Sequence, residues 1–337
     1  LLSLSVRGRG GGGGDGGGGD MERLMSVDSA GSLADHHAII QPAMDHPSRR
    51  TSRSSSVFSL VATLVGGGCL SLPFAFQKTG LVLGVTYLFV SGVLSGYSMR
   101  LLLSCSRRTG AQNYEECGEK AFGPRMKYVT MCLLIGMTFL ASVAYLILAR
   151  DLATPLVESY VTGHQTEQKT HNLIALVCLL PVVPLCYAKS LHSLRFTSLV
   201  SLLALCLLSV AIVYRTVDRA SQRPIRIDEL KLASAKVSDT VYALPFMELS
   251  FMAHFNLLPV HIGLRKPTRR RLDQVVFYTI FSAFVFYLLI SFSGYLFAYD
   301  HVCGDKSPST CKDGVPDNIL NAFDLHDTLI DIGRFGF

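Results

Sequence analysis

Three polar side chains that could take part in chemistry lie within one apolar stretch late in the chain. Glu248, His254 and Asn256 fall inside the segment 240–262, whose other residues are mostly apolar. Charged and polar side chains are costly in hydrocarbon, so in a membrane they face a protein interior or water and mark a binding site or an ion path. Glu248 could therefore bind and release a proton. The alternative is a structural carboxylate that pairs with His254 or with a backbone N–H group.

A second candidate site lies in an apolar stretch near residue 66. The stretch 57–76 contains a run of small residues that ends at a proline: Gly66, Gly67, Gly68, Cys69, Ser71 and Pro73. Glycine and proline break helices, and lipid cannot satisfy the backbone groups that a break frees, so the break persists where it holds a ligand. The freed N–H groups suit a carboxylate, and the freed carbonyl groups suit an ammonium group or a cation. The alternative is close helix packing through small residues.

The composition around these sites is that of a membrane protein. Of 337 residues, 49% are hydrophobic and 17% are charged, and the mean hydropathy is +0.37. This balance excludes an ordinary soluble domain and predicts an all-α membrane protein. The formal charge of +6 does not indicate nucleic acid as a partner, because the basic residues cluster in short loops between apolar stretches. We find no motif with the spacing of catalytic groups or of metal ligands, so we expect no enzyme and no metal site.

We expect seven membrane-spanning segments, since about 20 apolar residues cross a bilayer as a helix. They lie near residues 55–77, 81–103, 128–150, 172–188, 196–215, 240–262 and 275–298. The first and the sixth are the interrupted stretches. Because the sixth lies five spans after the first, a five-span repeat would place its second copy inverted in the membrane. Two broken helices in matching positions of inverted halves indicate a binding site near the midplane.

The chain divides into a tail and a membrane domain. Residues 1–53 are polar and rich in Gly, Ser and His, and we expect a disordered cytoplasmic tail there. Residues 54–337 form the transmembrane domain, with seven spans and the start of an eighth. Lys and Arg residues in the tail and after the second, fourth and sixth spans share one side if the N-terminus is cytoplasmic. The loop between the fifth and sixth spans disagrees, because it would place five basic residues outside.

The last loop on the outer side contains two cysteines, Cys303 and Cys311. A disulfide between them is favoured in a non-cytoplasmic compartment. The alternative is two free thiols.

Four segments carry a likeness to a known family. They are residues 56–76 (SVFSLVATLVGGGCLSLPFAF), 114–123 (YEECGEKAFG), 194–205 (LRFTSLVSLLAL) and 243–268 (ALPFMELSFMAHFNLLPVHIGLRKPT). They resemble the amino acid/auxin permease family, most of all its neutral and vacuolar amino acid transporters. The resemblance runs from about residue 55 to the end. It implies an inverted-repeat fold of the leucine-transporter type with broken first and sixth spans, here incomplete at the C-terminus, and therefore a fragment that would be inactive alone.

The resemblance also implies roles for individual residues. By the family pattern, the glycine run would contact a substrate carboxylate, and the backbone around Phe251 would meet the amino group. We expect substrate binding at Gly66, Gly67, Gly68, Cys69, Ser71 and Phe251, and the coupling ion at Ser59, Glu248, His254 or Asn256. Ala62 stands where sodium-coupled members carry asparagine, and Ser59 also stands where asparagine is common. The lost oxygen ligand favours a proton over sodium.

We therefore expect a secondary active transporter of neutral amino acids, coupled to a proton or to sodium and without another cofactor. Its partners are a small-molecule amino acid and the lipid bilayer, with no nucleic acid. It would lie in the plasma membrane or in a vacuolar or lysosomal membrane. The alternative is a seven-span receptor, which usually has its N-terminus outside, whereas the basic loops place this N-terminus inside.

Overall fold

The computed structural model describes residues 49, 51–158, 160, 168–180, 191–222, 231–234, 236–303, 315–323, 330–331 and 334. Helices make up most of this part of the chain, and Thr51 and Leu264 form an isolated parallel β-bridge. The elements are α2 (Arg53–Leu64), η1 (Gly67–Ser71), α3 (Leu72–Thr79), α4 (Leu81–Thr109), α5 (Tyr114–Phe122), α6 (Pro124–Val157), α7 (Gln168–Leu179), α9 (Leu191–Gln222), α10 (Val237–Ser250), α11 (His254–Gly263), α12 (Arg269–Cys303) and η4 (Ile319–Ala322).

The protein is an all-α, multi-pass membrane protein. Within the described residues, four helices are long and apolar enough to cross a bilayer: Leu81–Thr109, Pro124–Val157, Leu199–Gln222 and Arg269–Ala298. A fifth candidate is the pair Arg53–Leu64 and Gly68–Thr79, which is bent by 52°. These five segments lie where five of the seven expected spans were placed.

The other two expected spans have a different form. For the expected span 172–188, the described helix α7 ends at Leu179, and residues 181–190 lie outside the described part. The expected span 240–262 is divided into α10 and α11. Of the cysteines predicted to pair, Cys303 is the last residue of α12, and Cys311 lies outside the described residues.

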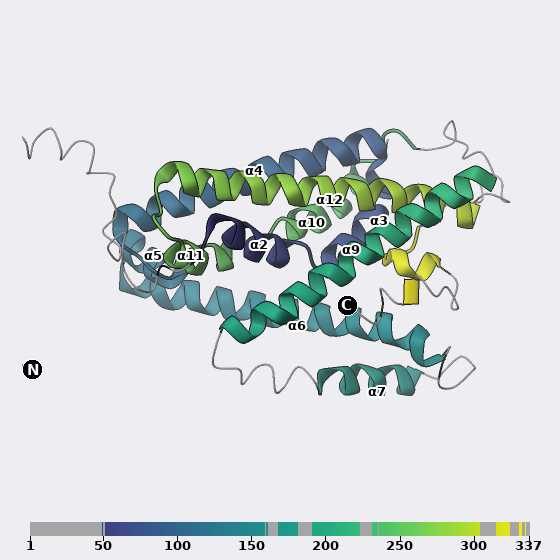
Figure 1. Ribbon diagram of the computed structural model, residues 1–337, viewed down its shortest axis with the longest axis horizontal. Helices are drawn as coiled ribbons and strands as arrows, with labels where there is room; N and C mark the ends of the chain where they lie inside the picture. The colour runs from purple at the N-terminus through teal and green to yellow at the C-terminus, as the bar shows by residue number, and fades with distance from the viewer. Residues whose placement is uncertain are drawn as a thin grey trace, which may run out of the picture.

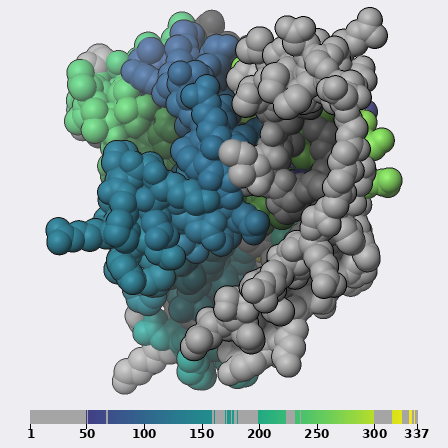
Figure 2. Space-filling model, turned by 90° about the vertical axis from the view of Figure 1, so that its left-hand side faces the viewer, coloured from purple at the N-terminus to yellow at the C-terminus, as the bar shows by residue number. Residues whose placement is uncertain are grey.

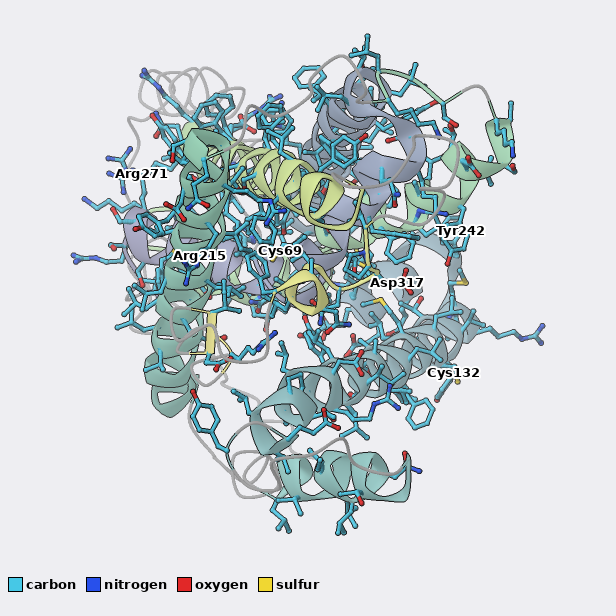
Figure 3. All side chains as sticks on the ribbon, turned by 90° about the vertical axis from the view of Figure 1, so that its right-hand side faces the viewer. Cys69, Cys132, Arg215, Tyr242, Arg271 and Asp317 are labelled. Carbon is cyan, nitrogen blue, oxygen red and sulfur yellow. The ribbon has the colours of Figure 1, made fainter. Side chains whose placement is uncertain are left out.

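The two long helices α4 and α12 lie side by side and run antiparallel (Figure 1). Arg100 and Asp273 meet at one end of this pair, and the rings of Phe89 and Phe284 meet further along it. The short helices α2, α3, α10 and α11 lie beneath the pair in Figure 1 and share its buried core. In Figure 3, Cys69 lies deep among these helices, whereas Cys132 of α6 lies at the edge of the molecule.

Helix α5 closes one end of the molecule, which Figure 2 shows in blue together with parts of α4 and α6. Its buried Cys117 lies with Sγ 3.2 Å from the Sγ atom of Cys105 on α4. Lys127 at the start of α6 pairs with Glu119 of α5 at 3.0 Å. These contacts fix α5 across the ends of the two spans that it joins.

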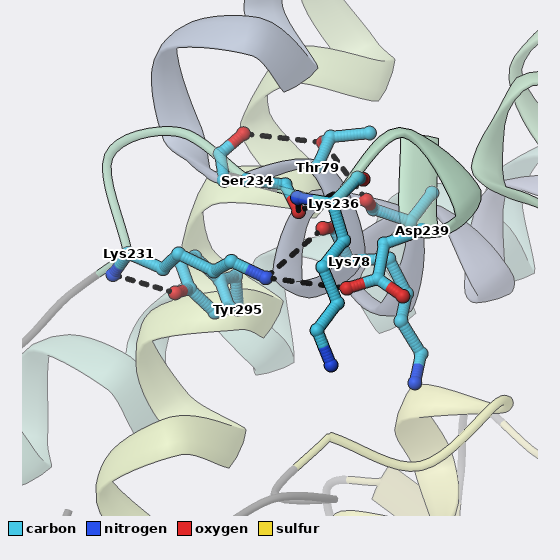
Figure 4. A network of polar contacts seen from close by, with 9 residues as sticks. Lys78, Thr79, Lys231, Ser234, Lys236, Asp239 and Tyr295 are labelled. Carbon is cyan, nitrogen blue, oxygen red and sulfur yellow. Dashed lines mark hydrogen bonds and ion pairs between the residues drawn. The ribbon is translucent and has the colours of Figure 1, made fainter. Parts of the chain in front are cut away.

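The joint between α3 and α4 is fixed by the segment 231–234, which leads towards α10 (Figure 4). The N–H groups of Leu81 and Val82 donate to the carbonyl oxygens of Lys231 and Leu232, both at 2.9 Å. Gly80 at this joint has φ +86°, a left-handed conformation that favours glycine. A Cβ atom there would lie 2.7 Å from backbone atoms of Ala233, so close approach also requires glycine.

Candidate functional site

The first predicted helix break is confirmed at the glycine run. Helix α2 ends at Leu64, and Val65 and Gly66 have non-helical backbone angles. A 3-10 helix then covers Gly67–Ser71, and α3 begins at Leu72. The first N–H groups of the 3-10 helix have no partner within that helix, because the acceptors three residues earlier precede it. The local sequence explains the break, since three glycines remove the side chains that favour helix and Pro73 suits the first turn of α3.

The second predicted break, in the expected span 240–262, is also confirmed. It lies after Pro245 in the sequence. Pro245 is inside α10, which continues to Ser250. The backbone leaves the helix from Phe251 to Ala253, and α11 begins at His254. The N–H group of Phe251 donates to the carbonyl oxygen of Glu248 at 3.1 Å. The interruption therefore lies at Phe251–Ala253, where the sequence contains no glycine or proline.

The two breaks lie against each other. A Cβ atom on Gly68 would be 3.4 Å from Ser250 Oγ, so the glycine run packs directly on the end of α10. On the other side, a Cβ atom on Gly66 would be 2.9 Å from Tyr145 Oη of α6. Cys69 and Phe251 are both buried. The structure thus brings the candidate residues of the first and sixth spans together.

Tyr287 of α12 joins the ends of both broken helices. Its hydroxyl oxygen lies 2.6 Å from the carbonyl oxygen of Leu64 and 2.6 Å from that of Ser250. These two residues are the last of α2 and of α10. A phenol has one proton, so it donates to one carbonyl group at a time. Both carbonyls belong to helix C-termini, which carry partial negative charge and attract a cation.

Three serines on α4 contact the second break. Ser91 Oγ donates to Glu248 Oε1 at 2.7 Å, and Ser95 Oγ donates to the carbonyl oxygen of Phe251 at 2.7 Å. A third serine, Ser98, lies with Oγ 2.5 Å from His254 Nε2. These serines were not among the predicted site residues, although their spacing of four and three residues places them on one helix face.

Two candidate residues for the coupling ion are linked through Thr63 of α2. Asn256 Nδ2 donates to Thr63 Oγ1 at 2.7 Å. The same hydroxyl donates to the carbonyl oxygen of Ser59 at 2.9 Å. These contacts join α11 to the last turn of α2. The two broken helices are therefore linked here as well as through Tyr287.

Glu248 lies outside the buried face of α10. Its side chain is exposed in the described structure and not buried, because the buried face of α10 is formed by Thr240, Ala243, Met247 and Ser250. Nor is it paired with His254, since the described contacts give each of the two residues its own serine. A position within an apolar stretch does not reveal which helix face a residue occupies.

Comparison with known proteins finds a family model and curated relatives that match this chain. A family model described as "Transmembrane amino acid transporter protein" matches residues 49–337. The "Sodium-coupled neutral amino acid symporter 2" of Danio rerio is 26% identical over 295 residues, which cover 81% of this chain. The chain spans 58% of the length of this relative.

Proposed function

The chain belongs to the transmembrane amino acid transporter family, whose model matches residues 49–337, and from this premise we propose that it serves cation-coupled symport of neutral amino acids. The observation that carries the proposal is the meeting of two broken helices at Tyr287. A lone kink would be explained by packing, whereas two facing breaks create opposed polar ends within an apolar bundle. The family and the relative are transporters, which leaves the receptor alternative without support.

The polar ends suit the two charged groups of an amino acid. The first N–H groups of η1, at Gly67 and Gly68, suit the substrate carboxylate. The carbonyl groups of Leu64 and Ser250 suit its ammonium group or a cation. Phe251 lies buried beside the second break and would line the space for the substrate side chain. Cys69 and Ser71 belong to the same 3-10 helix and complete the proposed binding segment.

We propose sodium as the coupling cation, against the expectation from Ala62 and Ser59, because backbone and phenol oxygens supply other ligands. Two carbonyl oxygens and a phenol oxygen converge at Tyr287, and hard oxygen ligands of this kind suit an alkali cation. The Danio rerio relative is named as sodium-coupled, which agrees with this choice. The second candidate is a proton carried by Glu248 or His254, favoured by their contacts with α4 serines next to the break.

Replacing the bridging phenol tests the proposal. In liposomes reconstituted with the full-length protein, we expect Tyr287→Phe to lower sodium-driven uptake of a radiolabelled neutral amino acid by about tenfold or more, because one oxygen that faces the cation is lost. The cation concentration for half-maximal uptake should rise. The matched control is Tyr295→Phe on the same helix, whose hydroxyl oxygen accepts a hydrogen bond from the N–H group of Lys231.

Two outcomes would contradict the sodium site. Normal uptake by Tyr287→Phe at every sodium concentration would remove the proposed site. Uptake driven by an imposed proton gradient and indifferent to sodium would transfer the coupling role to the second candidate. In that case Glu248→Gln and His254→Gln should each be tested for loss of the proton dependence.

A further inference from the structure

A separate cavity lies between α4 and α12, at the end where α12 begins. Its volume is about 260 Å³, and its lining includes Tyr97, Arg100, Leu101, Arg107, Arg269 and Asp273. Asp273 and the bridging Tyr287 are 14 residues apart on α12, which corresponds to about 21 Å along the helix axis. None of its lining residues belongs to the two helix breaks, so the cavity is distinct from the proposed transport site.

The charged lining of this cavity suits an anion. Three arginines, Arg100, Arg107 and Arg269, face a single carboxylate, that of Asp273. Arg100 Nε lies 3.8 Å from Asp273 Oδ1, with about half of each side chain exposed, so this ion pair is weak. Arg269 is also the first residue of α12, where the helix dipole favours negative charge. Guanidinium groups bind phosphate through paired N–H donors.

The surroundings of the cavity are apolar and exposed. On α4, Tyr97 and Leu101 are 59% and 52% exposed, and both line the cavity. On α12, Phe277 and Phe281 are 53% and 55% exposed, and their rings stack at 5.9 Å. Asp273, Phe277 and Phe281 follow one another at intervals of four residues, so they share a helix face. A ligand with an anionic head and an apolar tail would match both parts of this surface.

We propose that the cavity binds the phosphate headgroup of an anionic phospholipid, whose acyl chains lie along the exposed aromatic residues of α12. Basic cavities between membrane helices on the cytoplasmic side are suited to such lipids, and the cytoplasmic leaflet is the anionic one. The placement agrees with the orientation expected from the sequence, in which the ends of α4 and α12 that carry these arginines face the cytoplasm. A free anion would gain nothing from the exposed aromatic surface.

The test measures retained lipid. The purified protein, exchanged into mixed micelles of phosphatidylserine and phosphatidylcholine with identical acyl chains, is examined by native mass spectrometry. We expect preferential retention of phosphatidylserine, and a loss of about tenfold or more in the double variant Arg100→Gln/Arg269→Gln. The matched control is Arg108→Gln/Arg270→Gln, which removes two exposed arginines from the same end that do not line the cavity.

Equal losses in the two double variants would overturn the proposal, because a diffuse surface charge would then explain retention. Displacement of the lipid by inorganic phosphate at a comparable concentration would also overturn it, since a soluble anion would then suffice. A variant that removes a negative charge in place of a positive one covers the case in which the arginine variants fail to fold. Asp273→Asn removes the single lining carboxylate, so phosphatidylserine retention should rise several-fold, and unchanged retention would contradict the proposed site.

Discussion

At the scale of single residues, the glycines of the first break matter for the space that they leave. Gly66 lies where a side chain would meet the hydroxyl group of Tyr145, and Gly68 packs on Ser250. A side chain at either glycine would therefore contact Tyr145 or Ser250. Tyr287 adds a polar contact that connects the two broken helices. The glycines open the backbone here, and Tyr145 and Tyr287 from two other helices lie against the opening.

Gly66→Ala should lower uptake, because the new methyl group would lie 2.9 Å from Tyr145 Oη and one of them must move. Overpacking of this kind costs about 1–3 kcal/mol. Adding Tyr145→Phe removes the clashing oxygen, so the double variant should recover part of the uptake. Gly136→Ala on the same helix as Tyr145 is the matched control, since nothing lies within 4 Å of its Cβ position. Failure of the second substitution to restore any uptake would show that the contact with Tyr145 is not the cause.

At the scale of elements, α4 is the support of the second break. Ser91, Ser95 and Ser98 contact three successive parts of the 248–254 segment. The Ser95 hydroxyl supplies a donor to the backbone carbonyl of Phe251, where the helix is interrupted, whereas Ser91 and Ser98 contact side chains. Helix α4 continues from α3 through Gly80, so the first and second breaks are positioned from the same element.

Ser95→Ala should weaken this support. The buried carbonyl group of Phe251 would lose its donor, which costs about 1–3 kcal/mol for a buried polar group. We expect a lower thermal midpoint in detergent and a raised substrate concentration for half-maximal uptake. Thr86→Ala on the same helix is the control, because its hydroxyl group is exposed and bonds only within α4. Equal effects of the two substitutions would indicate a general loss of helix stability.

Gly80→Ala should destabilise the joint between α3 and α4. The change imposes a strained backbone, at about 1–3 kcal/mol, and also places Cβ 2.7 Å from the backbone of Ala233. Gly123→Ala separates the two causes, since Gly123 has φ +93° but no atom within 4 Å of its Cβ position. Thermal unfolding should therefore show a larger loss for Gly80→Ala, and losses of the same size would leave strain as the whole explanation.

At the scale of the whole molecule, orientation in the membrane decides which ends of the helices face which compartment. Helix α5 and the segment 231–234 lie at opposite ends of α4. Helix α5 follows the end of α4, whereas residues 231–234 contact the start of α4. The orientation that the basic loops favour would put α5 on the cytoplasmic side. The same assignment brings the arginine-lined cavity to the anionic leaflet.

Cysteine labelling tests this orientation. In a background without the native exposed cysteines, Lys236→Cys should react with a membrane-impermeant maleimide on intact cells, and Lys120→Cys should react after permeabilisation only. Both positions are exposed, so a difference reports the side of the membrane and not burial. The reverse pattern would place the N-terminus outside and would move the proposed lipid site to the other leaflet. The assay assumes a plasma-membrane location, and vesicles of either sidedness serve for an internal membrane.

The sequence by itself determined the membrane class, the family resemblance and the place of the first interruption, whereas the second lies several residues after Pro245, at the end of α10. Runs of glycine and proline act locally, so their effect on a helix can be predicted without knowing the fold. Only the tertiary structure decided what completes these interruptions. Tyr287, Ser95 and Tyr145 come from other helices far along the chain, and the outward face of Glu248 depends on which side of α10 is covered. Contacts between distant segments follow from packing, which no local pattern of residues specifies.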